Sequence, residues 1–250
     1  MKLIKNKLVI SLGNDYSINF PRPAEFYFQQ EWNQQLIKAK KRNTLLFNGP
    51  LFHVANWENK ENIVYLKLGL TDYKSYVCSR TKEFRRKFPE VPQSMPLALC
   101  ITLITSDRKL IVEQRKGVDI YNDFFHVPGG FLDPVKDLDQ KGIPEPFKGI
   151  DREVKEEVGL ELDINNIIFL GLAEDTIIPH YELCFLSEID LSSVEVLTVF
   201  NEMKTDGEFN HPIFIDFNKE SINSFLEDNN EKFSPTGRDC LIMAVNFRTQ

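Results

Sequence analysis

Cysteine is scarce in this sequence of 250 residues. Its four cysteines lie too far apart along the chain to form a C-x-x-C pair; they are Cys78, Cys100, Cys184 and Cys240. A zinc ribbon and a thioredoxin-type redox motif are therefore disfavoured. We expect free thiols in a reducing compartment.

The sequence also lacks long blocks of positive charge and long apolar runs. Its longest basic run is Lys40-Lys41-Arg42 and its formal net charge is −7, so we expect no general attraction to nucleic acid or to an anionic membrane. The apolar run 8–12 is too short for a signal peptide and predicts a strand, and no segment has the length of a transmembrane helix. We expect a soluble, cytoplasmic protein, and the sequence leaves its oligomeric state open.

Apolar residues, in contrast, are plentiful. Phenylalanine occurs 20 times and 42% of the residues are hydrophobic, which is ample for a buried core in one large domain or two modest ones. The Pro-punctuated stretch 88–92 is the best linker candidate. We therefore predict an N-terminal α+β unit over 1–93 and a second domain over 96–250.

Hydrophobic periodicity and turn residues predict the elements of both parts. In the first part we expect strands at 8–12, 51–57 and 62–70, a helix from Pro23 to about Lys41, and a helix capped by Thr71-Asp72 that runs toward Lys87. In the second part we expect strands at 97–105, 109–115, 124–130, 167–175, 180–189 and 212–217, and helices near 150–159, 192–203, 219–228 and 235–247. Strands and helices mix without strict alternation, which indicates an α/β or α+β sandwich with a mixed sheet.

The segment Asp151–Leu160, DREVKEEVGL, is unusually acidic. On a helix, Glu153, Glu156 and Glu157 stand at i, i+3 and i+4 and share one face. Ile150, Val154 and Val158 form an adjoining stripe that can be buried, and Gly159 stands where a glycine would end the helix. Carboxylates at this spacing repel one another unless a cation lies among them, and all-oxygen ligation suits Mg²⁺ or Mn²⁺.

The alternative is a solvated acidic helix in which Arg152 and Lys155 act as counterions, the usual fate of a charge run. Two features favour the metal-binding interpretation here. The glycine turn HVPGG precedes the helix, and an apolar strand pair precedes that turn.

The residues REVKEEVGL at 152–160 resemble the second half of the Nudix box, whose pattern is G-x5-E-x7-R-E-U-x-E-E-x-G-U with U aliphatic. Every fixed position of that half is met, and VPGGFLDP at 127–134 resembles the glycine-rich opening, with Gly130 as the first position. Lys136 stands where the family has Glu, and fifteen residues rather than seven separate it from Arg152. The Glu that braces the box arginine is therefore missing or supplied from elsewhere, and Glu145 is the nearest substitute.

Several segments outside the box resemble the Nudix UDP-glucose/UDP-galactose diphosphatases. They are LFNGPLFHV (46–54), YLKLGLTDYKSYV (65–77), the lengthened box, and FLGLAED…YELCFL (169–186). This resemblance covers most of the chain, including the N-terminal unit. It implies a Nudix-type α/β/α sandwich with an N-terminal α+β extension. It also implies metal-dependent hydrolysis of a UDP-sugar to UMP and a sugar 1-phosphate.

The resemblance also implies a set of site residues. Glu153, Glu156 and Glu157 are the expected catalytic metal ligands for Mg²⁺, with Mn²⁺ as an alternative and the Gly130 carbonyl as a further ligand. Glu182 is the candidate for an acidic residue outside the box that ligates metal or acts as base, or it is an ordinary outward strand carboxylate. For substrate binding we expect Arg115 or Lys116 to pair with the diphosphate, beside Gly129 and Gly130; the alternative is that either cation is simple surface charge. Arg152 is expected to orient the helix and its loop.

Other interpretations stay open at this point. The same chemistry could act on ADP-ribose, NAD(H) or coenzyme A, because substrate choice lies in loops. A non-catalytic Nudix-fold binding module is the third possibility, suggested by Lys136 and the long loop. Trp32 or Trp57 could stack on a uracil, and His126 could touch substrate, although a structural role is the commoner fate of each.

Overall fold

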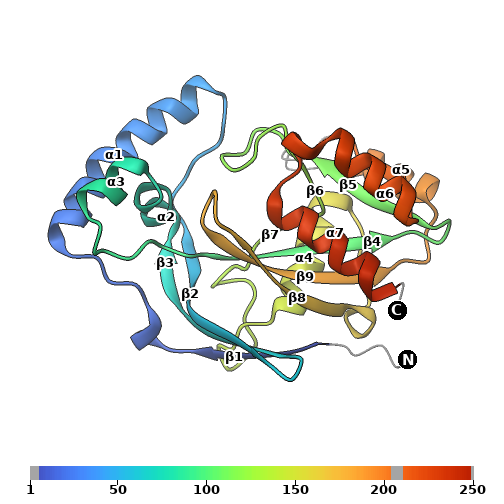
Figure 1. The fold of residues 1–250 in the computed structure, drawn as a ribbon, viewed down its shortest axis with the longest axis horizontal. Coiled ribbons are helices and arrows are strands. Elements are labelled where there is room, and N and C mark those ends of the chain that lie inside the picture. The colour runs from blue at the N-terminus through green and yellow to red at the C-terminus, as the bar shows by residue number, and fades with distance from the viewer. Residues whose placement is uncertain (1–5, 204–210, 249–250) are drawn as a thin grey trace.

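In the computed structural model, residues 6–203 and 211–248 are described. The chain forms two sheets with helices around them (Figure 1). The N-terminal part contains β1 (Lys7–Leu12), α1 (Arg22–Lys41), β2 (Pro50–Lys60), β3 (Ile63–Asp72), α2 (Tyr73–Ser79) and α3 (Lys82–Lys87), with the short 3-10 turn η1 (Asn14–Tyr16) after β1.

The rest of the chain contains seven strands and four α-helices within the described residues. The strands are β4 (Leu97–Ile104), β5 (Lys109–Gln114), β6 (Phe125–His126), β7 (Gly129–Phe131), β8 (Ile168–Asp175), β9 (His180–Glu188) and β10 (Ile213–Asp216). The helices are α4 (Pro146–Val158), α5 (Ser193–Glu202), α6 (Lys219–Asp228) and α7 (Pro235–Arg248), with 3-10 turns η2 (Ile164–Asn166) and η3 (Asn230–Lys232).

The larger sheet is mixed, as predicted. Its strand order is β10-β5-β4-β9-β8, with β6 beside β5 and β7 beside β4. The central pair β4 and β9 is parallel, whereas the neighbours β5, β7 and β8 pair antiparallel. The smaller sheet has the order β1-β3-β2.

Helices cover both faces of the large sheet, because residues along its strands alternate between two apolar clusters. On β4, Leu99 and Ile101 pack with the apolar stripe of α4 and with β2 and β3. Cys100 and Ile104 face the other way and pack with α6 and α7. The predicted α/β sandwich is therefore confirmed, and the smaller sheet shares one core with α4 and β4.

Two expected elements differ. The strand expected at 124–130 is divided into β6 and β7, which pair with β5 and β4 respectively. A single helix from Asp72 toward Lys87 was predicted, but α2 ends before Arg80 and α3 begins after Thr81. The Thr81 side chain accepts a hydrogen bond from the Phe84 backbone amide, and such an N-cap starts a new helix. Asp72 caps α2 as predicted, through the Ser75 amide.

The four cysteines are free and buried. The sulfur atoms of Cys100, Cys184 and Cys240 lie within 4.8 Å of one another, where α7 crosses β4 and β9. Cys240 Sγ lies 3.6 Å from the Phe185 carbonyl and 3.8 Å from the Cys100 carbonyl. These thiols are fully enclosed in the apolar cluster behind the sheet, and we interpret them as small residues that allow close packing of helix on sheet. No helix in the described ranges is both long and apolar enough to span a bilayer.

Candidate active site

The acidic helix α4 is oriented by its buried stripe. Ile150, Val154 and Val158 are fully buried against the sheet. Gly159 ends the helix with φ of 80°, a left-handed conformation that glycine adopts without strain. With the apolar stripe fixed on the sheet, the glutamates at positions 153 and 157 turn toward the glycine strand β7.

Two of the three glutamates are buried beside β7 and line a cavity. Glu157 Oε2 accepts a hydrogen bond of 2.8 Å from the Gly129 amide. The Glu153 carboxylate lies so near Gly130 that a Cβ there would approach it to 2.7 Å. Glycine at position 130 is thus what lets the carboxylate reach the strand.

Glu156 is the most exposed of the three glutamates, so the predicted face carries two buried carboxylates and one at its solvent edge. It is half exposed and pairs with Arg152 at 2.9 Å and with Lys136 at 3.5 Å. Residues 156 and 157 are about 100° apart around the helix, so Glu157 turns toward β7 while Glu156 lies at the solvent edge of the same face, where Arg152 bridges it to Glu153. Accordingly, among the described residues the three carboxylates do not form a group within 4.8 Å.

The two buried glutamates are held in an unfavourable electrostatic setting. Burial raises the pKa of Glu153 to about 7, with the Glu156 charge acting in the same direction and Arg152 opposing it. Burial, the carboxylate of Glu113 on β5 and the Glu153 charge raise the pKa of Glu157 well above its ordinary value. Two carboxylates in this state favour either protons or a cation between them.

Arg152 is braced by Asp137, which replaces the glutamate that the sequence seemed to lack. Arg152 Nε and Nη2 donate to the two oxygens of Asp137 at 2.9 and 2.7 Å. Glu145, the predicted substitute, instead pairs with Lys148 at the start of the helix. Asp137 also accepts a hydrogen bond from the Asp133 amide, so the same carboxylate shapes the loop that leads to the helix.

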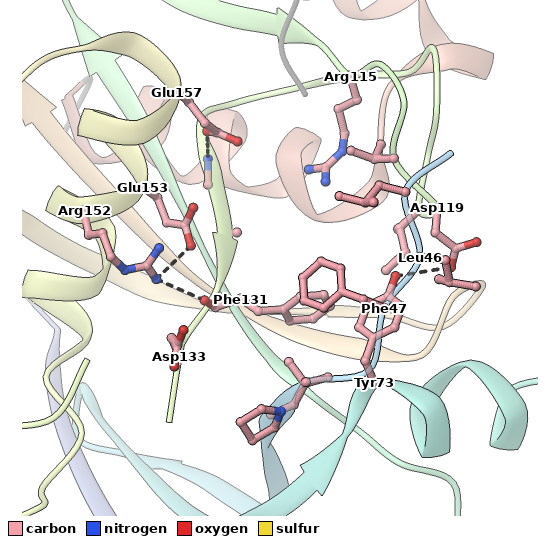
Figure 2. A pocket seen from close by; sticks show the side chains of 18 residues that line it. Leu46, Phe47, Tyr73, Arg115, Asp119, Phe131, Asp133, Arg152, Glu153 and Glu157 are labelled. Carbon is pink, nitrogen blue, oxygen red and sulfur yellow. Dashed lines mark hydrogen bonds and ion pairs between the residues drawn. The ribbon is translucent and has the colours of Figure 1, made fainter. Parts of the chain in front are cut away.

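A cavity of about 310 Å³ opens between these carboxylates and the N-terminal part of the chain. Figure 2 shows Glu153, Glu157 and Arg115 toward one end and Tyr73, Phe47 and Asp119 toward the other. Its lining comes from residues 45–51 and Tyr73, from the 115–120 segment, and from β7 and α4.

Of the two predicted diphosphate-binding cations, the structure brings only Arg115 to the cavity. Lys116 is exposed and lies outside its lining, because consecutive side chains in an extended segment point in opposite directions. Gly129 and Gly130 both line the cavity. A Cβ at Gly129 would come within 2.1 Å of the Leu99 carbonyl, so the strand pairing itself requires glycine there.

Glu182 is neither an outward strand carboxylate nor a member of the Glu153 group. It is buried on β9, and Oε1 lies 3.0 Å from His180 Nε2 and 3.4 Å from His126 Nε2. Burial works against its ionised form, but His126 and His180 outweigh burial and hold the pKa of Glu182 well below its usual range. Leu183 and Phe185 face the opposite side of the sheet, as strand alternation predicts.

His126 is buried, and its partner is a carboxylate. Burial lowers its pKa, but the Glu182 charge outweighs this and raises it. His126, Glu182 and Arg115 together line a second, much smaller cavity of about 40 Å³ beside Gly129 and Gly130.

The two tryptophans do not line either of these cavities. Trp32 packs against the aromatic cluster of α1 and α3, and Trp57 makes an edge contact with Tyr181. Sequence inspection missed Asp119, Tyr73 and Phe131, whose ring or carboxylate borders the large cavity. Tyr73 and Phe131 lie in segments that carry the resemblance, but no pattern marks them individually, and only the packing of the N-terminal part against β7 brings the three together.

The chemistry of the side chains beside β7 fits a divalent cation. The groups beside β7 offer carboxylate oxygen, which suits Mg²⁺ or Mn²⁺ and not a soft metal. Mg²⁺ in particular is commonly held by one or two carboxylates together with substrate phosphates and water. Glu153 and Glu157 fit that requirement, and the repulsion between them is what a cation would relieve.

The chain is similar in sequence to a known hydrolase. No known family profile matches the chain. The chain is 27% identical to Nudix hydrolase 9 of Arabidopsis thaliana, with 58% of this chain and 56% of that protein covered. The chain thus spans little more than half the length of this curated relative. The match supports the resemblance to the Nudix hydrolase superfamily.

Solved structures give a more distant likeness. The Nudix domain of Shewanella oneidensis NrtR, complexed with ADP-ribose, matches with a TM-score of 0.45 and 13% identity over 68% of this chain and 99% of that one. A MutT/nudix family protein from Enterococcus faecalis matches with a TM-score of 0.37 and 19% identity over 56% of this chain and 52% of that one.

Proposed function

We propose that this protein is a Nudix-type hydrolase that cleaves the diphosphate bond of a nucleoside diphosphate-linked small molecule with the help of a divalent metal. The observation that carries the proposal is the pair of buried carboxylates, Glu153 and Glu157, on a cavity wall beside the glycine strand. Arg115 lies on the same cavity, and the Asp137–Arg152 pair fixes the helix that presents the carboxylates.

Each residue of the candidate site has its own proposed role in the reaction. Glu153 and Glu157 would hold the cation, with the Gly130 carbonyl as a further candidate and Glu156 as an outer member of the group. When bound, Mg²⁺, or Mn²⁺ as the alternative, would offset the charge of the diphosphate and lower the pKa of an attacking water. Arg115 would donate to a phosphate oxygen as a charge-assisted partner.

Glu182 remains our candidate for the acidic residue outside the helix. Its Oε1 is occupied by two histidines, whereas Oε2 is buried without a hydrogen-bond partner among the described residues. The lowered pKa makes Glu182 a weak proton acceptor, so of its two proposed roles an anionic ligand or hydrogen-bond acceptor fits better than a general base.

For the substrate we propose UDP-glucose or UDP-galactose, hydrolysed to UMP and the sugar 1-phosphate. Support comes from the resemblance of residues 46–54, 65–77 and 169–186 to the UDP-sugar diphosphatases. Two of these segments contribute residues to the cavity or its frame, including Phe47, Leu51 and Tyr73. ADP-ribose, NAD(H) or coenzyme A is the alternative within the same chemistry.

A non-catalytic binding module is now the weaker alternative. It was suggested by Lys136 and the long loop before the helix. Asp137 supplies the brace from within that loop, so the loop does not imply a damaged site.

The test is phosphate release from a panel of nucleoside diphosphate-linked compounds, measured after a coupled phosphatase with and without Mg²⁺. We expect Mg²⁺-dependent turnover by the wild type and a loss of about 100-fold or more in Glu157→Gln. Because the charged form of Glu157 is disfavoured by burial, the neutral glutamine should not lower the melting temperature. Glu161→Gln, at an exposed glutamate that pairs with Lys155 beyond the helix end, serves as the matched control.

Each outcome has a distinct meaning. Absence of turnover on every diphosphate, or unchanged turnover in Glu157→Gln, would refute the metal-enzyme proposal. Preference for ADP-ribose over UDP-glucose would overturn the substrate proposal and leave the chemistry in place. Glu156→Gln tests whether Glu156 is an inner or an outer ligand. Because Glu156 is half exposed and ion-paired, this substitution should lower activity much less than Glu157→Gln does.

A further inference from the structure

The end of the cavity away from Glu157 is built differently from the carboxylate end (Figure 2). Tyr73 and Phe131 form an edge-to-face pair with ring centroids 6.0 Å apart, and both rings border the cavity. Leu51 and Ile120 are buried beside them. Phe47 stands at the rim with 66% of its surface exposed. This end offers flat apolar surfaces to a ring.

One carboxylate, Asp119, borders this apolar end. Tyr73 Oη donates to Asp119 Oδ2 at 3.2 Å, and Arg80 Nη2 makes an ion pair with the same oxygen. The Asp119 side chain is only 14% exposed. Both of these contacts fall on Oδ2, and Asp119 lines the cavity, so Oδ1 is the oxygen that a ligand would contact.

Asp119 is also held rigidly, from a different part of the chain. Asp119 lies in the segment between β5 and β6, whereas Tyr73 and Arg80 come from α2 and its end. The Arg80 guanidinium stacks over the Tyr76 ring at 4.6 Å, and Tyr76 is fully buried. Burial and the Asp119 charge raise the pKa of Tyr73 far above its ordinary value, so Tyr73 stays a donor to Asp119.

We propose that Asp119 is a specificity-determining residue that accepts a hydrogen bond from a hydroxyl or N–H group on a neutral ring attached to the diphosphate. The proposal rests on the proposed function. With the diphosphate between Arg115 and the carboxylates, one ring of the substrate extends toward Tyr73 and Phe131. A fixed, poorly solvated carboxylate selects ligands that bring a donor, because a ligand without one shields Oδ1 of Asp119 from water and gives it no hydrogen bond in return, while Oδ2 keeps its contacts with Tyr73 and Arg80.

The same chemistry occurs in two parts of such a substrate. The nucleoside has base N–H groups and ribose hydroxyls, and the second moiety, if it is a sugar, has hydroxyls around a ring whose C–H face packs on aromatics. Both present a donor and a flat face. The experiment below separates them.

The test uses the best substrate of the panel and two truncated forms of it. One form keeps the nucleoside diphosphate and replaces the second moiety by a methyl group. The other keeps the second moiety on the diphosphate and replaces the nucleoside by a methyl group. For wild type, Asp119→Asn and Tyr73→Phe, kcat/KM is measured on all three, and melting temperatures report on folding.

We expect Asp119→Asn to lower kcat/KM about 10- to 100-fold, the usual size for a hydrogen bond to a charged group, on substrates that contain the contacted ring. The truncated form that lacks this ring should be hydrolysed equally by variant and wild type. Tyr73→Phe, which removes one of the bonds that fix Asp119, should show the same substrate pattern with a smaller loss. Asp123→Asn, at an exposed aspartate of the same segment, is the matched control.

The ring that carries the effect identifies the moiety, and either ring supports the proposal. Equal loss on all three substrates, or no loss on any, would overturn it. If the wild type itself hydrolyses none of the panel, the proposed function fails. If the wild type is active and Asp119→Asn lowers kcat/KM equally on all three substrates or on none, only the assignment of Asp119 is refuted.

Discussion

At the scale of single residues, the loop before α4 shows how a motif can be kept while its spacing changes. Asp137 stands one position after the place where the Nudix pattern has glutamate, and its side chain is shorter by one methylene. It nevertheless makes two hydrogen bonds to Arg152 and is almost fully buried. A pattern read position by position misses this pair, because what matters is where the loop brings the carboxylate.

Replacement of this brace should therefore be costly. We expect Asp137→Asn to lower the free energy of unfolding by about 1.5 kcal/mol, because it weakens the two charge-assisted hydrogen bonds to Arg152, which keeps its ion pairs with Glu153 and Glu156. Activity should fall as well, since Arg152 also contacts Glu153 and the Phe131 carbonyl. Urea unfolding and kcat/KM measure the two effects.

Glu145→Gln gives the comparison. Among residues 6–203 and 211–248, the Glu145 side chain makes an ion pair with Lys148 at the surface, so its replacement should change the stability by less than about 1 kcal/mol. If Glu145→Gln proved as damaging as Asp137→Asn, the assignment of the brace would be wrong.

At the scale of elements, the site is a helix laid against a glycine strand. The valine stripe of α4 fixes which way the helix faces, and β7 approaches the acidic side closely because it lacks side chains at 129 and 130. The one-residue step between Glu156 and Glu157 then decides that one carboxylate points outward and the other inward. Helical periodicity predicts the angle between Glu156 and Glu157, but only the position of β7 shows which of the two side chains is buried.

Gly130→Ala should separate function from stability. Its Cβ would meet the flexible end of the Glu153 side chain, which can move at little cost to the fold but then leaves its place beside the strand. We expect activity to fall by about tenfold or more, with nearly unchanged melting temperature.

Gly142→Ala should show the reverse. Gly142 has φ of 78° in the loop before α4 and open space around it, so alanine adds backbone strain of about 1 kcal/mol without touching the cavity. Equal activity losses in the two variants would argue against the close approach at Gly130.

At the scale of the whole molecule, the N-terminal part and the α/β sandwich are joined by one core and by a polar contact at their junction. Residues of β2 and β3 pack in the same cluster as α4 and β4. His53 on β2 accepts a hydrogen bond of 3.0 Å from the Met95 amide through Nδ1, next to the bridge between His53 and Pro96. The domain boundary at residues 93–96 stays a prediction, but residues on both sides of this boundary line the cavity.

This junction predicts a pH dependence of stability. Burial lowers the pKa of His53 from 6.5 to about 4, so between these two pH values the imidazole is neutral in the folded protein and becomes protonated on unfolding. Stability is therefore full above pH 6.5 and falls as the pH drops toward 4, with a loss of up to about 2 kcal/mol between pH 7 and pH 5. His53→Asn should weaken this dependence, as measured by urea unfolding at several pH values.

His211→Asn, at an exposed histidine, should retain the dependence of the wild type. A His53→Asn variant with the full wild-type loss between pH 7 and pH 5 would show that other groups cause it.

Local features of the sequence predicted most of the strands and helices, whereas metal binding by the acidic helix stays a prediction. Local propensity, the valine stripe and turn glycines act over a few residues, so they predicted the strands, the mixed α/β class and an acidic helix of metal-binding type. Only the tertiary structure decided that Asp137 rather than Glu145 braces Arg152, that Glu156 points outward, and that Glu182 is held between two histidines. It also brought Tyr73, Arg80 and Asp119 to one end of the cavity. These contacts join residues far apart in the chain, and they depend on how a loop closes or how two sheets pack, which no short-range pattern encodes.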